Sequence, residues 1–439
     1  MIDNGYAQAN GSPFRISTPS NDHLIITSKQ LIKELIDAPP GDLSLHAVAK
    51  EMLQPKHTMN GFEWQDQRGV EGTGFVRAIR SRLTSHLPKI DRQLAMVIRE
   101  SLEEELRDCE AEGTARKRLF PMIKRIVTRV NCFVFFGEEL SRDEEFTTAA
   151  LEFPEVVVLT AEVMRITPNF LRPLVASFVT RQHRAAKTMS RYLEPIVSQR
   201  LALREQSFNK NEAVASDCMQ WLIDTSPRKN PWTPARMVSE IMAIWFSAVH
   251  QLAMTATYAI EDICLHSEHM QPVREEIRNQ LAIESETPIV VERLPLLDSF
   301  LKESIRFTNV DAISCRRKAL RDFVFGNGTV VQRGDWVCIP QRAMMHDARG
   351  YSDPENFDVF RFSRANALLG QSHRVKEVPD ESPGNLTTSN IYWPIWGLGN
   401  TACLDDPQSW EILRLIGAQT TRVADFVRLA MLDARYNIP

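Results

Sequence analysis

Apolar residues recur every three to four positions through most of residues 74–265. This spacing places them on one face of an α-helix. The segment 93–113 adds an acid-rich polar face and a closing glycine, and 119–136, 185–206 and 235–264 show the same period. The pattern therefore predicts a long helical body.

Shorter runs rich in β-forming residues flank this helical body. "FRIST" and "HLIITS" lie between residues 14 and 28, and "SKQLIKELIDA" then begins with Ser28, a residue type preferred at helix N-caps. After residue 305, "FVFGNGTVV" places Gly-Asn-Gly between two runs of Val and Phe, which is typical of a β-hairpin. These segments predict a minor β part beside the helices.

We interpret the chain as one large domain, mostly α with a minor β part. Neither a repeat of 20–50 residues nor a low-complexity linker divides the sequence. The expected parts are a small β-containing N-terminal part (1–60), a helical body (74–306), a β-rich part (307–345), and an irregular loop, a cysteine loop and a C-terminal helix (346–439).

The segment 241–260, "IMAIWFSAVHQLAMTATYAI", contains no Asp, Glu, Lys or Arg. Its length and hydropathy suit either a membrane span or a helix buried in a large core. His250 and Gln251 lie at its middle, where a lipid-facing polar pair is costly, and neither flank carries a positive cluster. We interpret it as a buried helix, and the want of a second span disfavours a transporter. The N-terminal 30 residues predict neither a signal peptide nor a membrane anchor.

Composition narrows the class of protein further. Hydrophobic residues make up 43% of the chain and charged residues 25%, as in ordinary globular proteins. The formal charge of −4 argues against nucleic acid as a partner. The 7 cysteines are scattered without paired spacing, which predicts no disulfide framework or zinc site and favours a reducing compartment.

Three short stretches contain candidate functional residues. Glu303 and Arg306 are three residues apart in "LPLLDSFLKESIRF", as in a surface ion pair. Arg361 lies in the aromatic-rich "YSDPENFDVFRFSR", where a solvated arginine in a turn is the simple interpretation. Cys403 in "WGLGNTACLDDP" could be an inert buried thiol.

In order and spacing, the three stretches resemble the signatures of the cytochrome P450 family, the haem-thiolate monooxygenases. Glu303 and Arg306 match the family's Glu-x-x-Arg, and Arg361 matches the arginine that completes a buried triad with them. "LPLLDSFLKESIRF" and "VNCFVFFGEELSR" are similar to segments of fungal members. The resemblance implies that the triad is a structural brace, because removing one member leaves a buried charge unpaired.

The same resemblance assigns residues to a haem b cofactor. Cys403 matches the cysteine whose thiolate is the ligand of the iron, with Trp396 in the aromatic position and Gly399 in the glycine position of that motif. A thiolate ligand favours O–O bond cleavage at haem iron. Arg80 in "IRSRLTSHLP" matches a basic residue that reaches a haem propionate.

The central helix departs from the family pattern. The family carries an acid followed by threonine, which deliver protons to dioxygen, whereas "SAVHQL" has His250 and Gln251 at those positions. Imidazole titrates near neutrality and can pass a proton, so we expect a catalytic relay through His250 and Gln251. The alternative is a core histidine that bonds a backbone carbonyl.

The sequence after Cys403 departs as well. Leu404, Asp405 and Asp406 stand where the family has Pro, Gly and Arg. The basic residue usual at 400–401 is replaced by Asn and Thr. Carboxylates near a thiolate disfavour its charge, which predicts weakened haem retention.

The resemblance implies a monooxygenase that inserts one oxygen atom from O2 into an apolar small molecule. Terpenoid-like substrates of fungal secondary metabolism are expected by analogy. The expected electron donor is NADPH-cytochrome P450 reductase, and the expected location is cytoplasmic or peripheral on the endoplasmic reticulum membrane. The alternative function is a non-catalytic P450-like protein that binds an apolar ligand with weak or no haem binding.

Overall fold

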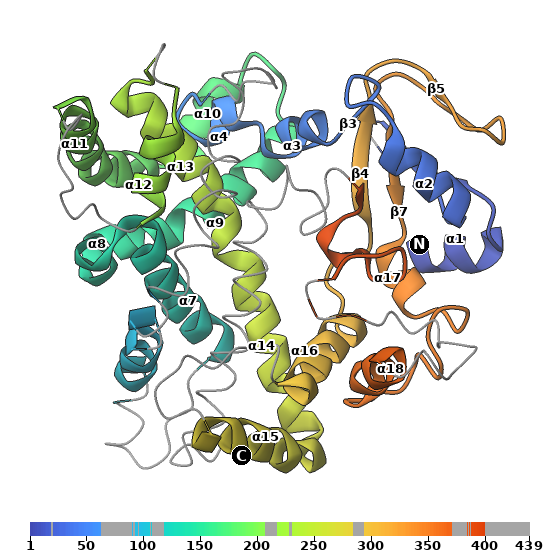
Figure 1. Ribbon diagram of the computed structural model, residues 1–439. Helices are drawn as coiled ribbons and strands as arrows, with labels where there is room; N and C mark the ends of the chain where they lie inside the picture. Colours follow the sequence, from blue (N-terminus) through green and yellow to red (C-terminus); the bar gives the residue numbers. More distant parts are fainter. Residues whose placement is uncertain are drawn as a thin grey trace. The chain divides into compact units, whose positions relative to one another are not determined.

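The computed structural model of the protein is mostly helical with a small sheet part, as the sequence predicts (Figure 1). It describes residues 1–18, 21–62, 90, 93–94, 96–105, 107, 118–206, 217–227, 231–283, 294–370, 384, 386 and 388–399. The α-helices with assigned bounds are α1 (Ile2–Ala9), α2 (Lys29–Asp37), α3 (Leu45–Leu53), α4 (Pro55–Thr58), α7 (Leu119–Phe136), α8 (Glu138–Arg142), α9 (Glu144–Ile166), α10 (Arg172–Val179), α11 (Arg184–Gln206), α12 (Cys218–Thr225), α13 (Pro234–Ala248), α14 (His250–Leu265), α15 (Met270–Ile283), α16 (Pro295–Phe307), α17 (Gln341–Met345) and α18 (Arg361–Gly370). The described residues also contain the short 3-10 helices η2 (Ser267–His269) and η4 (Pro394–Trp396). The strands are β1 (Phe14–Ser17), β2 (Asp22–Ile25), β3 (Leu43–Ser44), β4 (Ser314–Ala319), β5 (Phe323–Val324), β6 (Val330–Val331) and β7 (Trp336–Ile339).

Contacts between residues divide the chain into two compact units. Among the described residues, the first unit contains 1–49 and 258–399, and the second contains 50–257. The boundaries fall within α3 and α14. The sequence-based division into a single domain with four parts stays a prediction.

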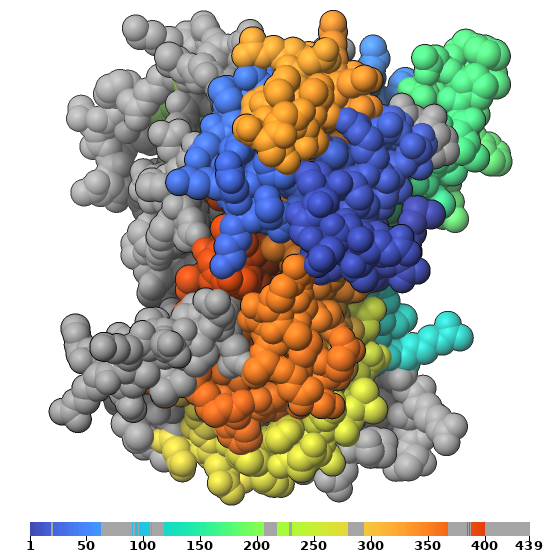
Figure 2. Space-filling view, turned by 90° about the vertical axis from the view of Figure 1, so that its right-hand side faces the viewer, coloured from blue at the N-terminus to red at the C-terminus, as the bar shows by residue number. Residues whose placement is uncertain are grey.

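The first unit is built on a five-stranded sheet in the order β1-β2-β7-β4-β3. β1 pairs antiparallel with β2, β2 parallel with β7, and β7 antiparallel with β4. α2 begins at Ser28, whose side chain accepts a hydrogen bond from the N–H of Leu31, as the N-cap pattern predicts. Its buried face packs on the sheet, and the shared apolar core includes Leu31, Ile32, Leu35, Val337 and Ile339. Figure 2 shows the N-terminal segment in dark blue against orange segments of this same unit.

The predicted hairpin is also present in the first unit. β5 and β6 pair antiparallel, with Val324 opposite Val330. Gly328 in the connecting turn has a φ of 83°, a left-handed conformation that favours glycine. The "GNG" signal therefore identified this turn correctly.

The second unit is helical, and an aromatic cluster lies at the centre of its core. Trp245 of α13 is fully buried and meets the ring of Phe135 edge-on at a centroid distance of 5.3 Å. Phe136 meets Phe146 of α9 in the same manner at 5.0 Å. The indole N–H of Trp245 donates to the carbonyl of Ala150 at 2.8 Å, so its polar atom is satisfied inside the core.

Three segments differ from the sequence-based expectation. Residues 2–9 form α1. No helix was predicted before the first strand, because this segment is short and lacks an apolar stripe. Residues 361–370 form α18 within a region that was predicted to be irregular. The central apolar helix is not continuous, because Val249 separates α13 from α14.

The region Pro234–Leu265 is long and apolar enough to cross a membrane by composition alone. However, 61% of its most apolar window is buried inside the protein. This burial agrees with its interpretation as a core helix.

Candidate functional site: a buried charged brace and the approach to Cys403

Glu303, Arg306 and Arg361 form a triad inside the first unit. Glu303 Oε2 lies 2.8 Å from Arg306 Nε and 3.1 Å from Arg361 Nε. The second carboxylate oxygen accepts from Arg306 Nη2 at 2.8 Å. All three residues are at most 1% exposed, so the pair on α16 is not a surface ion pair.

The triad connects α16 to the loop that precedes α18. Arg306 Nη1 donates to the carbonyls of Met345 at 3.0 Å and Pro354 at 2.9 Å. The backbone N–H of Asp358 donates to Glu303 Oε1 at 2.9 Å. Arg361 donates to the carbonyls of Ser352, Asp353 and Asn356. Every charged group thus has partners, which a buried charge requires.

The start of α16 is held by a neighbouring carboxylate. Pro295 occupies the first turn, where its missing N–H costs no hydrogen bond. Glu276 of α15 accepts from the backbone N–H groups of Leu296 at 2.8 Å and Leu297 at 2.9 Å. Burial raises the pKa of Glu276, and these two hydrogen bonds oppose that rise. The helix that carries the triad is therefore fixed at its N-terminus.

Lys302, which precedes Glu303, is also fully buried. Its Nζ donates to the carbonyl of Gly384 at 2.8 Å. The ammonium group lies 4.4 Å from the centre of the Phe362 ring and 5.1 Å from that of Trp393. Burial lowers the pKa of Lys302 to about 7, against the attraction of Asp298. Contacts with two aromatic rings partly replace the lost hydration of the cation.

The segment that approaches Cys403 is anchored on α16 through Leu386. Asp298 accepts from the N–H of Leu386 at 3.0 Å. The carbonyl of Leu386 accepts from the indole N–H of Trp393 at 3.0 Å and from that of Trp396 at 2.7 Å. Trp396, the residue at the aromatic position of the cysteine motif, is 7% exposed. The motif's aromatic ring is thus held from the same helix as the triad.

The glycines before Cys403 adopt conformations that other residues avoid. Gly397 has a φ of 76° and Gly399 a φ of 65°. A Cβ added to Gly399 would lie 1.8 Å from Cγ2 of Ile36 on α2, so this position also has no room for a side chain. This close approach fits the tight turn that a haem-thiolate loop requires. Cys403 itself, like Arg80, lies outside the described residues.

His250 and Gln251 lie in the second unit, at the start of α14. His250 is partly buried, and its Nε2 has no hydrogen-bond partner among the described residues. Burial lowers the pKa of His250. The charge of Glu155 raises this pKa by a smaller amount, and the charge of Lys124 lowers it further. Gln251 is exposed, and its carbonyl accepts from Thr255 Oγ1 at 2.9 Å. The imidazole is therefore neutral near pH 7.

The structure brings together the predicted residues of the first unit. Glu303, Arg306, Arg361 and Trp396 are all linked to α16, and Gly399 ends the described part of the cysteine segment. Sequence reasoning missed Lys302, although a lysine beside Glu303 in an apolar helix was a visible signal. The roles of Trp396 and Gly399 toward a cofactor remain predictions.

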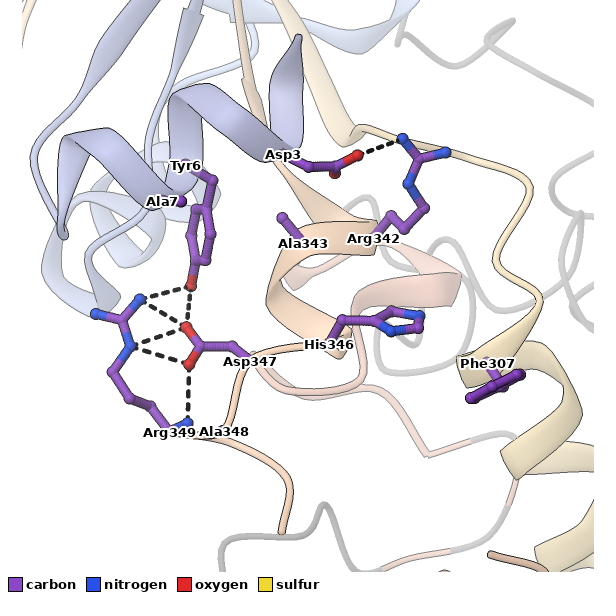
Figure 3. A pocket seen from close by; sticks show the side chains of 10 residues that line it. All are labelled: Asp3, Tyr6, Ala7, Phe307, Arg342, Ala343, His346, Asp347, Ala348 and Arg349. Carbon is purple, nitrogen blue, oxygen red and sulfur yellow. Dashed lines mark hydrogen bonds and ion pairs between the residues drawn. The ribbon is translucent and has the colours of Figure 1, made fainter. Parts of the chain in front are cut away.

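A surface pocket of the first unit is lined by Phe307, the residue that follows Arg306 of the triad (Figure 3). Its volume is about 550 Å³, and α1 and α17 line it together with Phe307 and residues 346–349. Tyr6 donates to Asp347 at 2.5 Å, and Arg342 donates to Asp3 at 2.7 Å. Burial and the Asp347 contact raise the pKa of Tyr6 to about 12. The Arg342–Asp3 pair ties α1 to α17, and the Tyr6–Asp347 bond ties α1 to the segment after α17. Arg349 also pairs with Asp347, so these charged side chains of the pocket are paired with one another.

Comparison with known proteins supplies the family. The cytochrome P450 family model matches residues 4–379. Cytochrome P450 monooxygenase 103 of Postia placenta is 27% identical over 92% of this chain and 77% of its own length. Cytochrome P450 monooxygenase olcJ of Penicillium canescens is 27% identical over 84% of this chain and 68% of its own length. A retinoic acid-bound cyanobacterial CYP120A1 has the same fold, with a TM-score of 0.63 and 17% identity, over 97% of this chain and 85% of that one.

The family match, the relatives, the fold and the buried triad together define a haem-thiolate monooxygenase, a class of oxidoreductase. The chain belongs to the cytochrome P450 family. Haem b is therefore its expected cofactor, and an organic substrate, O2 and a redox partner are expected in general.

Proposed function

We propose that this chain inserts one oxygen atom from O2 into an apolar small molecule in fungal secondary metabolism, with terpenoid-like compounds as the substrate class. The observation that supports this most strongly is the buried Glu303–Arg306–Arg361 triad, with α16 also anchoring the approach to Cys403. Buried charges by themselves stabilise a fold poorly. Their presence here is therefore best explained by the loop that they hold in place.

In this proposal each residue has a specific task. Cys403 would hold the haem iron through its thiolate, and Arg80 would bond a propionate. When bound, haem supplies the activation of dioxygen. His250 would accept a proton from solvent and pass it on, because its neutral imidazole can do both near pH 7. Gln251, exposed beside it, would orient the proton path.

We also propose peripheral association with the endoplasmic reticulum membrane and electron supply by NADPH-cytochrome P450 reductase. An apolar surface of the second unit supports the membrane contact. Ile166, Phe170, Leu174 and Phe178 are between 72% and 86% exposed. We call these four residues the α9–α10 patch.

The charges around the α9–α10 patch favour an anionic lipid surface. Residues 163–184 contain four arginines and no Asp or Glu; Arg165 pairs with Glu162 and Arg184 with Glu152, and Arg172 and Arg181 lie closest to the patch in sequence. Arginines beside exposed aromatic and leucine side chains are typical of segments that lie in the membrane interface. The patch thus supports surface association and does not require a membrane span.

The experiment that tests haem-thiolate function is the carbon monoxide difference spectrum of the reduced protein. A strongly red-shifted Soret band is expected for the original chain and for Cys132→Ala, a matched control at a fully buried thiol. Cys403→Ala should lose this band. A shifted band that persists in Cys403→Ala, or that disappears in Cys132→Ala, would contradict the assignment.

A non-catalytic P450-like protein that binds an apolar ligand is the second candidate. Two observations favour it: the family match ends at residue 379, and Leu404, Asp405 and Asp406 replace the family's residues after the cysteine. If the aspartates weaken haem retention, Asp405→Gly combined with Asp406→Arg should raise the haem content per chain. Haem-free original protein that binds an apolar fluorescent probe with micromolar affinity would support the second candidate.

A further inference from the structure

The break between α13 and α14 lies immediately before His250. Val249 is fully buried, with φ −102° and ψ −55°, and belongs to neither helix. A break frees backbone groups from the helical ladder, and a freed carbonyl inside a core requires another donor. The position of that donor determines which part of the protein stabilises the break.

The donor comes from another helix. Asn131 of α7 is fully buried, and its Nδ2 donates to the carbonyl of Ala248 at 2.6 Å. Both residues belong to the second unit, where the ring of Phe135 on α7 also contacts that of Trp245 on α13. Removing the amide would take this donor away from the buried carbonyl of Ala248, which costs free energy. The bond therefore ties α7 to the last residue of α13.

A second hydrogen bond acts on the same turn. Ser247 Oγ donates to the carbonyl of Ile244 at 2.8 Å, a local bond of the kind that bends helices. Helical hydrogen bonding resumes after the break, where the N–H of Ala253 donates to the carbonyl of Val249 at 3.1 Å. The assigned helical structure is interrupted at Val249, between Ala248 and His250. The direction of the His250 side chain depends on the dihedral angles of Val249.

We propose that Asn131 is a positioning residue: by holding the carbonyl of Ala248, it maintains the break that orients the His250 imidazole. The proposal rests on the proposed proton-relay function of His250, but its structural part stands apart from haem binding. Asn131 does not touch the reacting atoms. Its effect reaches the reaction through Ala248, Val249 and His250.

Hydrogen–deuterium exchange of the purified protein tests the structural part, whether or not haem is bound. Asn131→Ala should speed the exchange of the backbone amides of residues 250–254 about tenfold, because one buried hydrogen bond is lost. The matched control is Thr128→Val, one turn earlier on α7. Thr128 is equally buried, but its hydroxyl bonds the carbonyl of Lys124 within its own helix. Equal exchange of 250–254 in the two variants would overturn the proposal.

A double-mutant cycle tests the link to catalysis. Asn131→Ala should divert reducing equivalents to peroxide in the same direction as His250→Ala, and the double variant should be no worse than His250→Ala alone. Additive losses would show that Asn131 acts elsewhere and would overturn the proposal. If Asn131→Ala is insoluble, Asn131→Leu keeps a similar side-chain size without a hydrogen-bond donor or a charge and should give the same results. A chain without thiolate-bound haem would refute the proposed function and leave the exchange test intact.

Discussion

The ammonium group of Lys302 lies 4.4 Å from the centre of the Phe362 ring, and both side chains are fully buried. This contact joins α16 to α18, directly beside the Glu303–Arg361 ion pair that joins the same helices. Two adjacent residues of α16 thus place one cation and one anion in the interior. Because the two side chains carry opposite charges, their replacements can be tested separately.

Lys302 should make stability depend on pH in a predictable direction. Burial lowers its pKa to about 7 from an ordinary value of 10.5. Between these values the unfolded chain binds more protons than the folded chain, so Lys302 makes the free energy of unfolding rise with pH. Lys302→Met should remove this pH dependence. Its free energy of unfolding should therefore be highest, relative to that of the original chain, at the acidic end of the range. Urea unfolding between pH 6.5 and 9.5 measures the effect.

The control for this experiment is Lys33→Met, at an exposed lysine of α2. This variant should retain the slope of the original chain. If Lys302→Met also retains it, Lys302 titrates at its ordinary pKa and burial does not perturb it.

Glu303 should act through folding and not through turnover. Glu303→Gln leaves the guanidinium groups of Arg306 and Arg361 buried without their counter-charge, at a cost of about 3–5 kcal/mol. The expected result is insoluble or haem-free protein, measured as soluble yield and haem per chain. Glu268→Gln, at an exposed acid, should be normal. Soluble, fully haem-loaded Glu303→Gln with selectively reduced turnover would refute a structural role of Glu303.

His250 should contribute to proton delivery. His250→Ala is expected to retain haem and substrate binding while more of the NADPH consumed appears as peroxide. Because burial lowers the pKa of His250, the original chain should keep its coupling above pH 7, where the imidazole is neutral. Unchanged coupling in His250→Ala would make this a core histidine. His269→Ala, in the first unit, is the control and should leave coupling unaffected.

The α9–α10 patch should bind lipid. Replacing Phe170, Leu174 and Phe178 together by serine should weaken binding to vesicles containing phosphatidylserine at least about tenfold, because the loss of even one fully buried apolar side chain, about 1.5–3 kcal/mol, corresponds to that factor. Flotation of the purified protein with vesicles measures this. Leu265→Ser, at a leucine that is 76% exposed outside the patch, should have no effect. Equal binding of the triple variant would exclude the patch as the membrane contact.

The amino-acid sequence by itself determined the class of fold and the identity of the brace. Helical periodicity, the Ser28 N-cap and the "GNG" hairpin are local properties, so they predicted α2, the β5–β6 hairpin and the helical body. Glu303, Arg306 and Arg361 could be recognised because their types and order resemble a family pattern. The contact between Glu303 and Arg361 could not be derived from spacing, since the two residues are 58 positions apart.

Only the tertiary structure decided which polar groups meet inside the protein. Asn131 and Ala248 are 117 positions apart, and no periodicity along the chain relates an amide on one helix to a carbonyl on another. The break at Val249 was invisible for the same reason, because the apolar sequence around it suits an unbroken helix and the competing donor comes from α7. Likewise, the position of the Lys302 ammonium group between two aromatic rings depends on Phe362 of α18 and Trp393 packing against α16. Local sequence sets the secondary structure, whereas buried hydrogen bonds across the fold decide where that structure is interrupted.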